Sequence, residues 1–364
     1  MKKRPNLSTC LKRFTGVGLL ALATGAFTSL ALAQEDPPDR PMFGWLPNDN
    51  PSLAAATPLP EWNGSFVYNA TTYNFSMVGT NPATTNTATT IPVVIIPVKI
   101  VIKRGGTQTF DPSSVPTNTN GLTAIQNTVM SPIFDSTTTY TQGGVDVGTT
   151  QYIDAFQRAN FWGSVHTNTN YHLLLGVPTV MPEVTLTPPL LKGKTGSPFG
   201  ETVAEVDQPW IDGQFKGLLT SLGIQPNTLA IFMTYKTYLT SHGCCIGGYH
   251  SATGGNSYME FTYIDKVATF SQDVSALTHE LGEWADDPLI NQPQGNQTAC
   301  GILEVGDPLE RNANFGDFPY VLHGFTFNLQ DLVTLPYFGA PPSTSVNNFF
   351  TFQGETLTVC QNGA

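Results

Sequence analysis

The residues whose types and spacing best suit chemistry lie together at positions 279–283, which have the sequence His-Glu-Leu-Gly-Glu. His279 and Glu283 are four positions apart, so on a helix both side chains project from one face and can reach a single metal ion. Glu280 is offset by about one residue's rotation. From there a carboxylate can approach a metal-bound water without ligating the metal and act as a general base. The spacing therefore predicts a metal site with a catalytic carboxylate beside it.

These side chains need a helix to position them, and the flanking residues predict one. Thr269 and Gln272 have the spacing of a capping box, so we expect the helix to begin near Thr269 or Ser271, and Pro288 should end it. The apolar side chains gather on one side of this helix: Phe270, Val274, Leu277, Leu281, Trp284 and Ala285. The polar side chains gather nearly opposite: His279, Glu283 and Asp286.

The polar face has two interpretations. It could be the solvent-exposed side of an amphipathic surface helix, or it could hold a cation. Residues 279–287 concentrate four acidic residues and a histidine in a chain with only 12% charged residues. Acidic residues in the last helical turn also oppose the helix dipole, and they cost stability unless a cation is present. These two observations favour the cation.

The segment resembles the H-E-x-x-H helix of the zinc metallopeptidases, or zincins, in its H-E-L-G-E motif, the position of Glu280 and the predicted helix–strand–strand–helix order. Glu283 stands where that family has its second histidine, which makes this an H-E-x-x-E variant. The resemblance implies a zincin-like second half, hydrolysis of peptides with Glu280 activating water, and a divalent metal ion held by His279 and Glu283. Zinc is the first candidate, although a carboxylate-rich site can prefer another ion.

Three positions are candidates for a third ligand. Glu304 follows Glu283 by 21 residues, similar to the spacing of the ligating Glu in the thermolysin-like branch, and it is our first choice. Asp307 corresponds to the orienting Asp of that branch or is an alternative ligand. His250 lies in a Gly-rich segment between two predicted strands, where an active-site loop could lie, and it is the other candidate.

The rest of the pattern predicts an α+β fold with a β-rich first half. The alternation over 65–78 and the Val/Ile run over 91–102 predict strands, and Pro92 and Pro97 should limit the pairing of the second. Further elements are expected in this order: a helix over 151–161, short strands or loops over 171–186, a helix from the N-cap Asp207 to Gly223, and strands over 228–238 and 258–264.

The first residues have the pattern of a secretory signal peptide. Five basic residues lie before or at the start of an apolar stretch, and Ala31-Leu32-Ala33 has the pattern of a cleavage site, so no transmembrane anchor is expected after cleavage. The expected organisation is a signal peptide over 1–33, a Pro-rich arm or propeptide over 34–60, a β-rich region over 61–200 and the zincin-like region over 201–364, with 61–364 alternatively forming one compact domain.

The charge balance argues against a nucleic-acid partner. The 364 residues include 16 Lys+Arg and 27 Asp+Glu, a net charge of −11. Residues 1–33 contain five basic and no acidic residues, so their removal lowers the net charge to −16. Four cysteines follow them, an even number in an oxidising compartment: Cys244, Cys245, Cys300 and Cys360. Two disulfides are expected, and three connectivities, including one that joins Cys244 to Cys245, stay open.

These observations favour a secreted, extracellular or periplasmic, metal-dependent hydrolase that acts on an extracellular peptide or polymer. The alternative is a non-catalytic exported binding or cell-surface protein with a structural cation site or a degenerate active site. A glycoside hydrolase fits less well, because its two acids face each other across roughly 5 to 9.5 Å from different elements. The sequence does not specify the substrate or the oligomeric state.

Overall fold

The computed structural model describes residues 42–51, 58–68, 70–117, 119, 121–241, 243–290, 303–334, 338–346 and 349–357. The expected signal peptide, part of the Pro-rich arm, Cys300 and Cys360 lie outside these residues. The chain divides into two units after Asp36, and all of the described residues belong to the unit that begins at Pro37. This unit combines many strands with few helices, a mixture of α and β structure. None of its described helices is long and apolar enough to cross a membrane.

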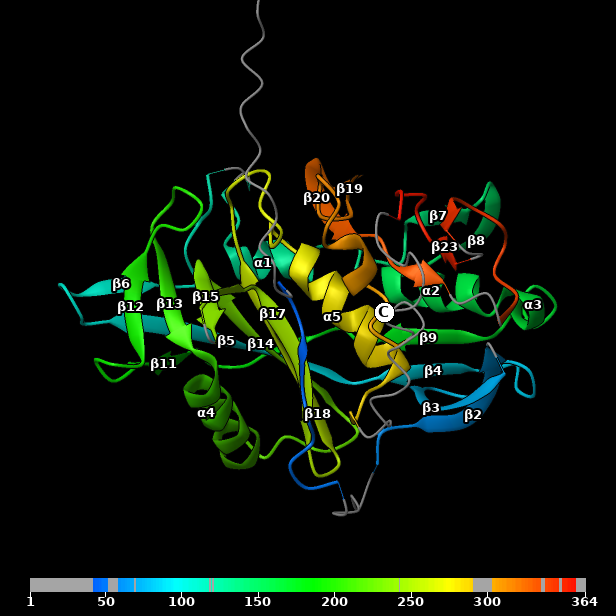
Figure 1. Cartoon of the computed structure of the whole chain (residues 1–364), viewed down its shortest axis with the longest axis horizontal. Helices are drawn as coiled ribbons and strands as arrows, with labels where there is room; N and C mark the ends of the chain where they lie inside the picture. The colour runs from blue at the N-terminus through cyan, green and yellow to red at the C-terminus, as the bar shows by residue number, and fades with distance from the viewer. Residues whose placement is uncertain are drawn as a thin grey trace, which may run out of the picture. The chain divides into compact units, whose positions relative to one another are not determined.

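A mixed sheet forms the centre of this unit (Figure 1). Its strands lie in the order β1 (Trp45–Leu46), β17 (Gly248–Thr253), β18 (Asn256–Tyr263), β14 (Leu229–Tyr235), β5 (Val93–Ile102) and β10 (Thr179–Val180), and β11 (Val184–Leu186) and β6 (Gln108–Phe110) also pair with β5. β14 is parallel to β18 and β5, whereas β17 is antiparallel to β18. Because β5 comes from the first half of the chain and β14 from the second, the two halves share one sheet.

The other elements belong to helices and smaller sheets. The helices are α1 (Ala124–Val129), α2 (Tyr152–Asn160), α3 (Trp162–Val165), α4 (Gln208–Ser221), α5 (Ser275–Asp286) and the 3-10 turn η2 (Asp307–Leu309). The small sheets are β2 (Glu61–Tyr68) with β3 (Thr71–Val78), β4 (Ala88–Ile91) with β9 (His172–Leu175), β7 (Thr139–Gln142) with β8 (Val145–Thr149), β12 (Gly193–Gly196) with β13 (Val203–Asp207), β15 (Thr237–Thr240) and β16 (Cys244–Ile246), β19 (Asp317–Leu322) with β20 (Phe325–Gln330), and β21 (Val333–Thr334) with β23 (Phe349–Thr351) and β22 (Ser345–Val346).

The helices α4 and α5 cover opposite faces of the central sheet. Phe215 of α4 belongs to a core cluster with Ile96 of β5, whereas Leu281 of α5 belongs to another with Ile95. Adjacent residues of β5 thus face different helices, as the period of two in a strand requires. This arrangement lays α5 across the sheet, next to β17 and β18.

Most of the predicted elements are present. α2 and α4 match the predicted helices, and the side chain of Asp207 caps α4 by accepting a hydrogen bond from Trp210 N. The strands expected near 228–238 and 258–264 are β14 with β15, and β18. The alternation over 65–78 belongs to the hairpin of β2 and β3.

The two prolines limit the pairing of β5 less than expected, since this strand lies inside the sheet. Pro92 precedes β5, and its carbonyl accepts a hydrogen bond from Leu229 N. Pro97 falls between the residues that pair with β10 and those that pair with β11. At such a gap a missing N–H interrupts the ladder least.

The predicted start of α5 is wrong. The helix begins at Ser275, and Val274 at its N-cap makes no side-chain capping bond. Gln272 instead accepts a hydrogen bond from Ala268 N, and Thr269 donates one to Lys266 O. The polar pair therefore closes a turn ahead of the helix. The end of the helix, at Asp286 before Pro288, is as predicted.

Gly282 lets other chain segments approach α5 closely, and this gives a test of the packing. A Cβ at this position would lie 2.6 Å from Leu332 Cδ1, whereas a Cβ at Gly213 in α4 would meet nothing within 4 Å. Gly282→Ala should lower the free energy of unfolding by about 1–3 kcal/mol through overpacking. Gly213→Ala should raise it by up to about 1 kcal/mol through helix propensity. Denaturant titrations that show the same sign for both variants would contradict the close packing.

Candidate functional site

Other elements cover the helix α5 on all sides, so its polar face is not exposed to solvent. The residues His279, Glu280, Glu283 and Asp286 are all 0% exposed. β17, β18, β20, β3 and α2 contact the helix. The surface-helix interpretation is therefore wrong, and the polar side chains face groups inside the molecule.

Gln330, at the end of β20, orients the ring of His279. Its Nε2 donates a hydrogen bond to Phe315 O at 2.9 Å, which leaves its Oε1 to face Nδ1 of His279. Because Oε1 can only accept, Nδ1 carries the proton and Nε2 of His279 has a free lone pair. This is the tautomer in which a histidine binds a metal ion through Nε2 while a neighbouring group holds the ring.

Two carboxylate oxygens lie against that lone pair. Glu283 Oε1 is 2.9 Å from His279 Nε2, and Asp307 Oδ1 is 3.6 Å from it. Among the described residues, His279 Nε2 and Asp307 Oδ1 are buried atoms without a hydrogen-bond partner. Three acceptor atoms that face one another need a proton or a cation between them.

His250 reaches the same carboxylates from the sheet. It lies on β17, paired with Met259 of β18, and not in a loop as the Gly-rich sequence suggested. Its Nδ1 is 3.1 Å from Glu280 Oε2 and 3.6 Å from Glu283 Oε2. The side chain of His250 is 1% exposed, so a ring nitrogen is presented to α5 in a dry environment.

The candidate ligands form two groups that share Glu283. One group is His250, Glu283 and Glu304, and the other is His279, Glu283 and Asp307. In each group the ligand atoms lie within 4.8 Å of one another. The structure therefore brings every candidate ligand from the sequence to one place, but it groups Glu304 with His250 and not with His279.

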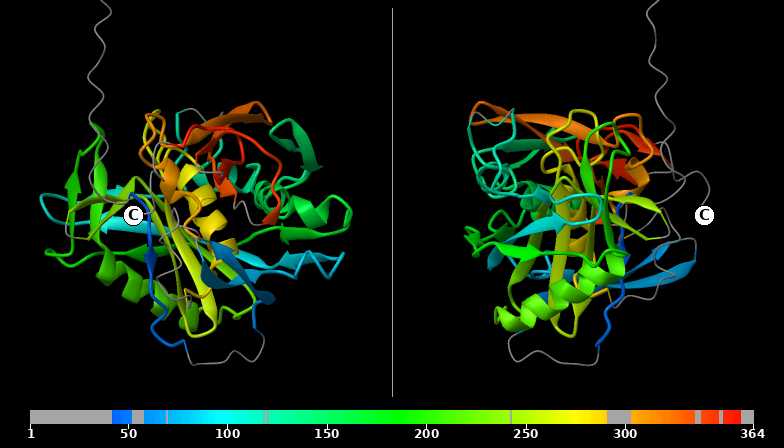
Figure 2. Two further views of the ribbon diagram at one scale, coloured as in Figure 1. Left: turned by 45° about the vertical axis from the view of Figure 1, so that its right-hand side comes forward. Right: turned by 90° about the vertical axis from the view of Figure 1, so that its left-hand side faces the viewer.

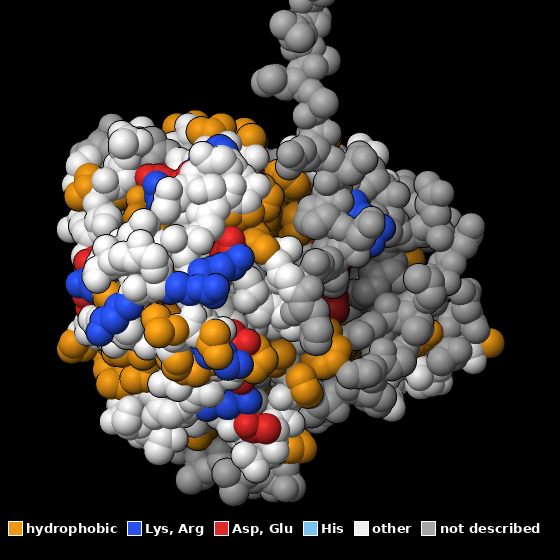
Figure 3. All heavy atoms as spheres, turned by 60° about the vertical axis from the view of Figure 1, so that its left-hand side comes forward, with side chains coloured by type: hydrophobic (Ala, Val, Ile, Leu, Met, Phe, Trp, Pro, Cys, Tyr) orange, Lys and Arg blue, Asp and Glu red, His pale blue; other side chains and the backbone are white. Residues whose placement is uncertain are grey.

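The carboxyl groups of the cluster resist ionisation. Burial, followed by the charges of neighbouring carboxylates, raises the pKa of Glu280, Glu283 and Glu304 well above the usual range, and burial also raises that of Asp307. Lys and Arg side chains gather on the face shown in Figure 3. Several lysines pair with other carboxylates: Lys99 with Asp111 and Glu183, Lys194 with Glu205, and Lys236 with Glu201 and Asp265. In the described part of the chain, no Lys or Arg forms an ion pair with Glu280, Glu283 or Asp307.

Both histidines are in the form that binds metals. Burial, with the neighbouring His279 as a smaller cause, lowers the pKa of His250 to about 3. Burial also lowers the pKa of His279 to about 4, although Asp307 and Gln330 act in the opposite direction. Near pH 7 each imidazole is therefore neutral and keeps a lone pair for a metal.

The segment 42–46 covers His279. The ring centroids of Phe43 and His279 are 4.1 Å apart, and Phe43 is 1% exposed. Met42 N and Phe43 N donate to Glu310 Oε1 at 3.1 and 2.9 Å. β1 continues this segment parallel to β17, and Figure 2 shows its dark blue strand at the edge of the sheet. This part of the Pro-rich arm is therefore built into the site.

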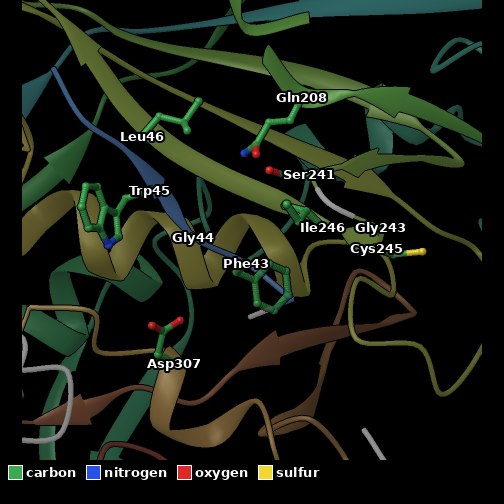
Figure 4. Close-up of a pocket in the computed structure, with 10 residues that line it drawn as sticks. All are labelled: Phe43, Gly44, Trp45, Leu46, Gln208, Ser241, Gly243, Cys245, Ile246 and Asp307. Carbon is green, nitrogen blue, oxygen red and sulfur yellow. The ribbon is translucent and has the colours of Figure 1, made fainter. Parts of the chain in front are cut away.

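A pocket of about 400 Å³ adjoins this segment (Figure 4). It is lined by Phe43, Gly44, Trp45, Leu46, Gln208, Ser241, Gly243, Cys245, Ile246 and Asp307. Asp307 is the candidate ligand among these residues, and its side chain is 34% exposed while its Oδ1 is buried. The pocket therefore reaches the cluster on the side of Asp307.

Cys244 and Cys245 are bonded to each other. This is one of the connectivities that the sequence left open, and it places a vicinal disulfide beside the pocket. Cys300 and Cys360 lie outside the described residues.

Three side chains at the site have no motif in the sequence: Gln330, Glu310 and Phe43. Each comes from a segment far from α5 along the chain, so local spacing does not mark it. One residue in the sequence could have indicated the close approach of the downstream segment: Gly306, which lies between Glu304 and Asp307. A Cβ at this glycine would lie 2.3 Å from His279 Nδ1, so the glycine allows the downstream segment to approach the histidine.

Comparisons with known proteins give no match: no family model, no curated protein and no solved structure is similar to this chain.

Asp286 gives a test of the burial around α5. Burial, then the charge of Asp287, raises its pKa from 3.8 to about 8, although Gln157 donates a hydrogen bond to it. Between these values the folded chain binds the additional proton, so stability falls as the pH rises, by up to about 1.4 kcal/mol per pH unit. Asp286→Asn should gain stability relative to the wild type from pH 4 to 8 in denaturant titrations of chelator-treated protein. Parallel pH profiles would contradict this assignment.

Proposed function

We propose that this chain is a secreted metal-dependent hydrolase of the peptidase-like kind, with zinc as the first candidate ion. The observation that carries the proposal is the lone pair of His279 Nε2, held by Gln330 against buried carboxylates, with Glu280 in the next position of α5. Imidazole and carboxylate donors suit zinc and other divalent first-row ions. Secretion rests on the signal-peptide pattern of residues 1–33.

Glu283 would hold the ion together with His279 and Asp307, or together with His250 and Glu304. A divalent ion bound there would polarise a substrate carbonyl and make a coordinated water more acidic. The carboxylates of Glu304 and Asp307 each group with one of the ligating nitrogens. This leaves Glu280 for proton transfer.

Glu280 has the surroundings of a general base. Its Oε2 faces His250, and its Oε1 is buried without a hydrogen-bond partner among the described residues. Burial raises the pKa of Glu280, which makes its ionised carboxylate a stronger base. This carboxylate would take a proton from the attacking water and return it to the leaving amine.

A zincin-like arrangement is part of this proposal. α5 carries the H-E-L-G-E motif, and α4 precedes it as the first helix. Five strands, β14 to β18, lie between the two helices where the sequence pattern predicted two. In this arrangement the variant Glu283 replaces a histidine and contributes a negative charge to the site.

A non-catalytic exported protein with a structural cation is the second candidate. It is favoured by the packing of Phe43 on His279, because structural metal sites are closed. The pocket beside Asp307 favours the hydrolase instead, because catalytic metal sites keep an open position. Removal of the ion should lower stability for both candidates, whereas only the hydrolase should also lose turnover.

Glu280→Gln separates these candidates. The variant should keep its metal content, because Glu280 is not placed as a ligand, and should lose about 10²–10⁴-fold in turnover of unfolded polypeptide substrates. Glu260→Gln is the matched control: Glu260 is also buried, and its Oε1 accepts a hydrogen bond from Thr234. Metal analysis and peptide hydrolysis are measured on both.

Two results would contradict the proposal. Chelator-free preparations without a stoichiometric ion would exclude the metal site. Undiminished turnover in Glu280→Gln would exclude Glu280 as the general base. Absence of turnover in every metal-loaded form would leave the non-catalytic protein with a structural cation as the remaining candidate.

A further inference from the structure

Glu283 turns its two carboxylate oxygens to two different histidines. Oε1 lies 2.9 Å from His279 Nε2, and Oε2 lies 3.6 Å from His250 Nδ1. His279 comes from α5 and His250 from β17, so the two nitrogens approach Glu283 from separate elements. A carboxylate that bridges two metal ions presents one oxygen to each of them.

Each histidine has its own additional carboxylate. Glu304 belongs to the group of His250, and Asp307 belongs to the group of His279. Within each group the ligand atoms lie within 4.8 Å of one another. This is close to the separation of two donors on opposite sides of one ion, each about 2.1 Å from it.

The charge of the cluster also fits two ions. The carboxylates without a Lys or Arg partner among the residues the structure describes include Glu280, Glu283 and Asp307, and Glu304 lies beside them. Buried carboxylates are costly unless protonated or compensated. One divalent ion compensates two of the three negative charges of Glu280, Glu283 and Asp307, so a second ion is needed to compensate the third.

Two neighbouring acids, Glu310 and Glu260, have hydrogen-bond donors of their own, so the proposed metal site does not include them. Glu310 accepts two backbone N–H groups, and Glu260 accepts the hydroxyl of Thr234. His279 Nε2, in contrast, is fully buried, lacks a hydrogen-bond partner among the described residues and is aimed at the oxygens of Glu283 and Asp307. This nitrogen is an observation independent of the acidic residues.

We propose that the site holds two divalent cations bridged by Glu283, one with His250 and Glu304 and the other with His279 and Asp307. This rests on the proposed function, because it specifies the metal content of the same site. Ions about 3.5–4 Å apart form a clamp for the attacking and leaving oxygens in other two-metal hydrolases. The pocket beside Asp307 then gives a substrate access to the ion held by His279.

The test is metal content, measured apart from turnover. The full-length secreted protein is stripped with a chelator, reloaded with zinc or manganese(II) and freed of excess ion. We expect two ions per chain by elemental analysis. With manganese, we expect the paramagnetic resonance spectrum of an exchange-coupled pair.

Variants assign the two positions. Glu304→Gln and Asp307→Asn should each bind one ion per chain and lose the coupled spectrum, and Glu283→Gln should weaken both ions by at least tenfold. Glu310→Gln is the control, since its amide oxygen can still accept the backbone N–H groups, and it should keep two ions. Circular dichroism and thermal unfolding establish that each variant is folded.

The outcomes distinguish this inference from the proposed function. One ion per wild-type chain, with the spectrum of an isolated manganese centre, overturns the two-metal site and leaves the single-metal hydrolase intact. No bound ion overturns both. The wild-type measurements decide the question even if a variant does not fold.

Discussion

The burial of ionisable groups around α5 is the constraint on which the rest of the structure depends. A carboxylate taken out of water must be protonated, hydrogen-bonded or matched by a cation, because its desolvation costs several kcal/mol. Here Glu280 and Glu283 share one dry volume with two neutral histidines, and Asp307 joins them from the edge of the pocket. Hydrophobic packing from β17, β18, β20 and α2 must hold this cluster closed against that cost.

The surrounding residues meet this constraint by giving each histidine a fixed direction. Gln330 fixes the protonated nitrogen of His279, and Phe43 packs on the ring. Gly282 and Gly306 remove the Cβ atoms that would hold neighbouring segments away. The site is therefore assembled by residues from five parts of the chain, and its geometry depends on long-range packing more than on the helix that carries the motif.

The sequence predicted the parts of this arrangement that depend on local spacing. The helix with His279, Glu280 and Glu283, its end before Pro288, and the cap of α4 at Asp207 follow from period and capping. The start of α5 was mispredicted because Thr269 and Gln272 bond to an earlier turn. The placement of His250 on β17 and its grouping with Glu304 depend on sheet register, which spacing along the chain does not specify. Gln330 and Phe43 contact the site only through tertiary folding.

The short strand β1 has a consequence for how this sheet meets other molecules. An unpaired edge exposes a row of N–H and C=O groups that can pair with another chain. At β17 this edge is occupied by the chain itself, through Gly247 N to Met42 O at 2.8 Å and His250 N to Gly44 O at 3.1 Å. A foreign strand that reached His250 by this route would have to replace these hydrogen bonds one for one. The same segment thus protects the fold from edge-to-edge association.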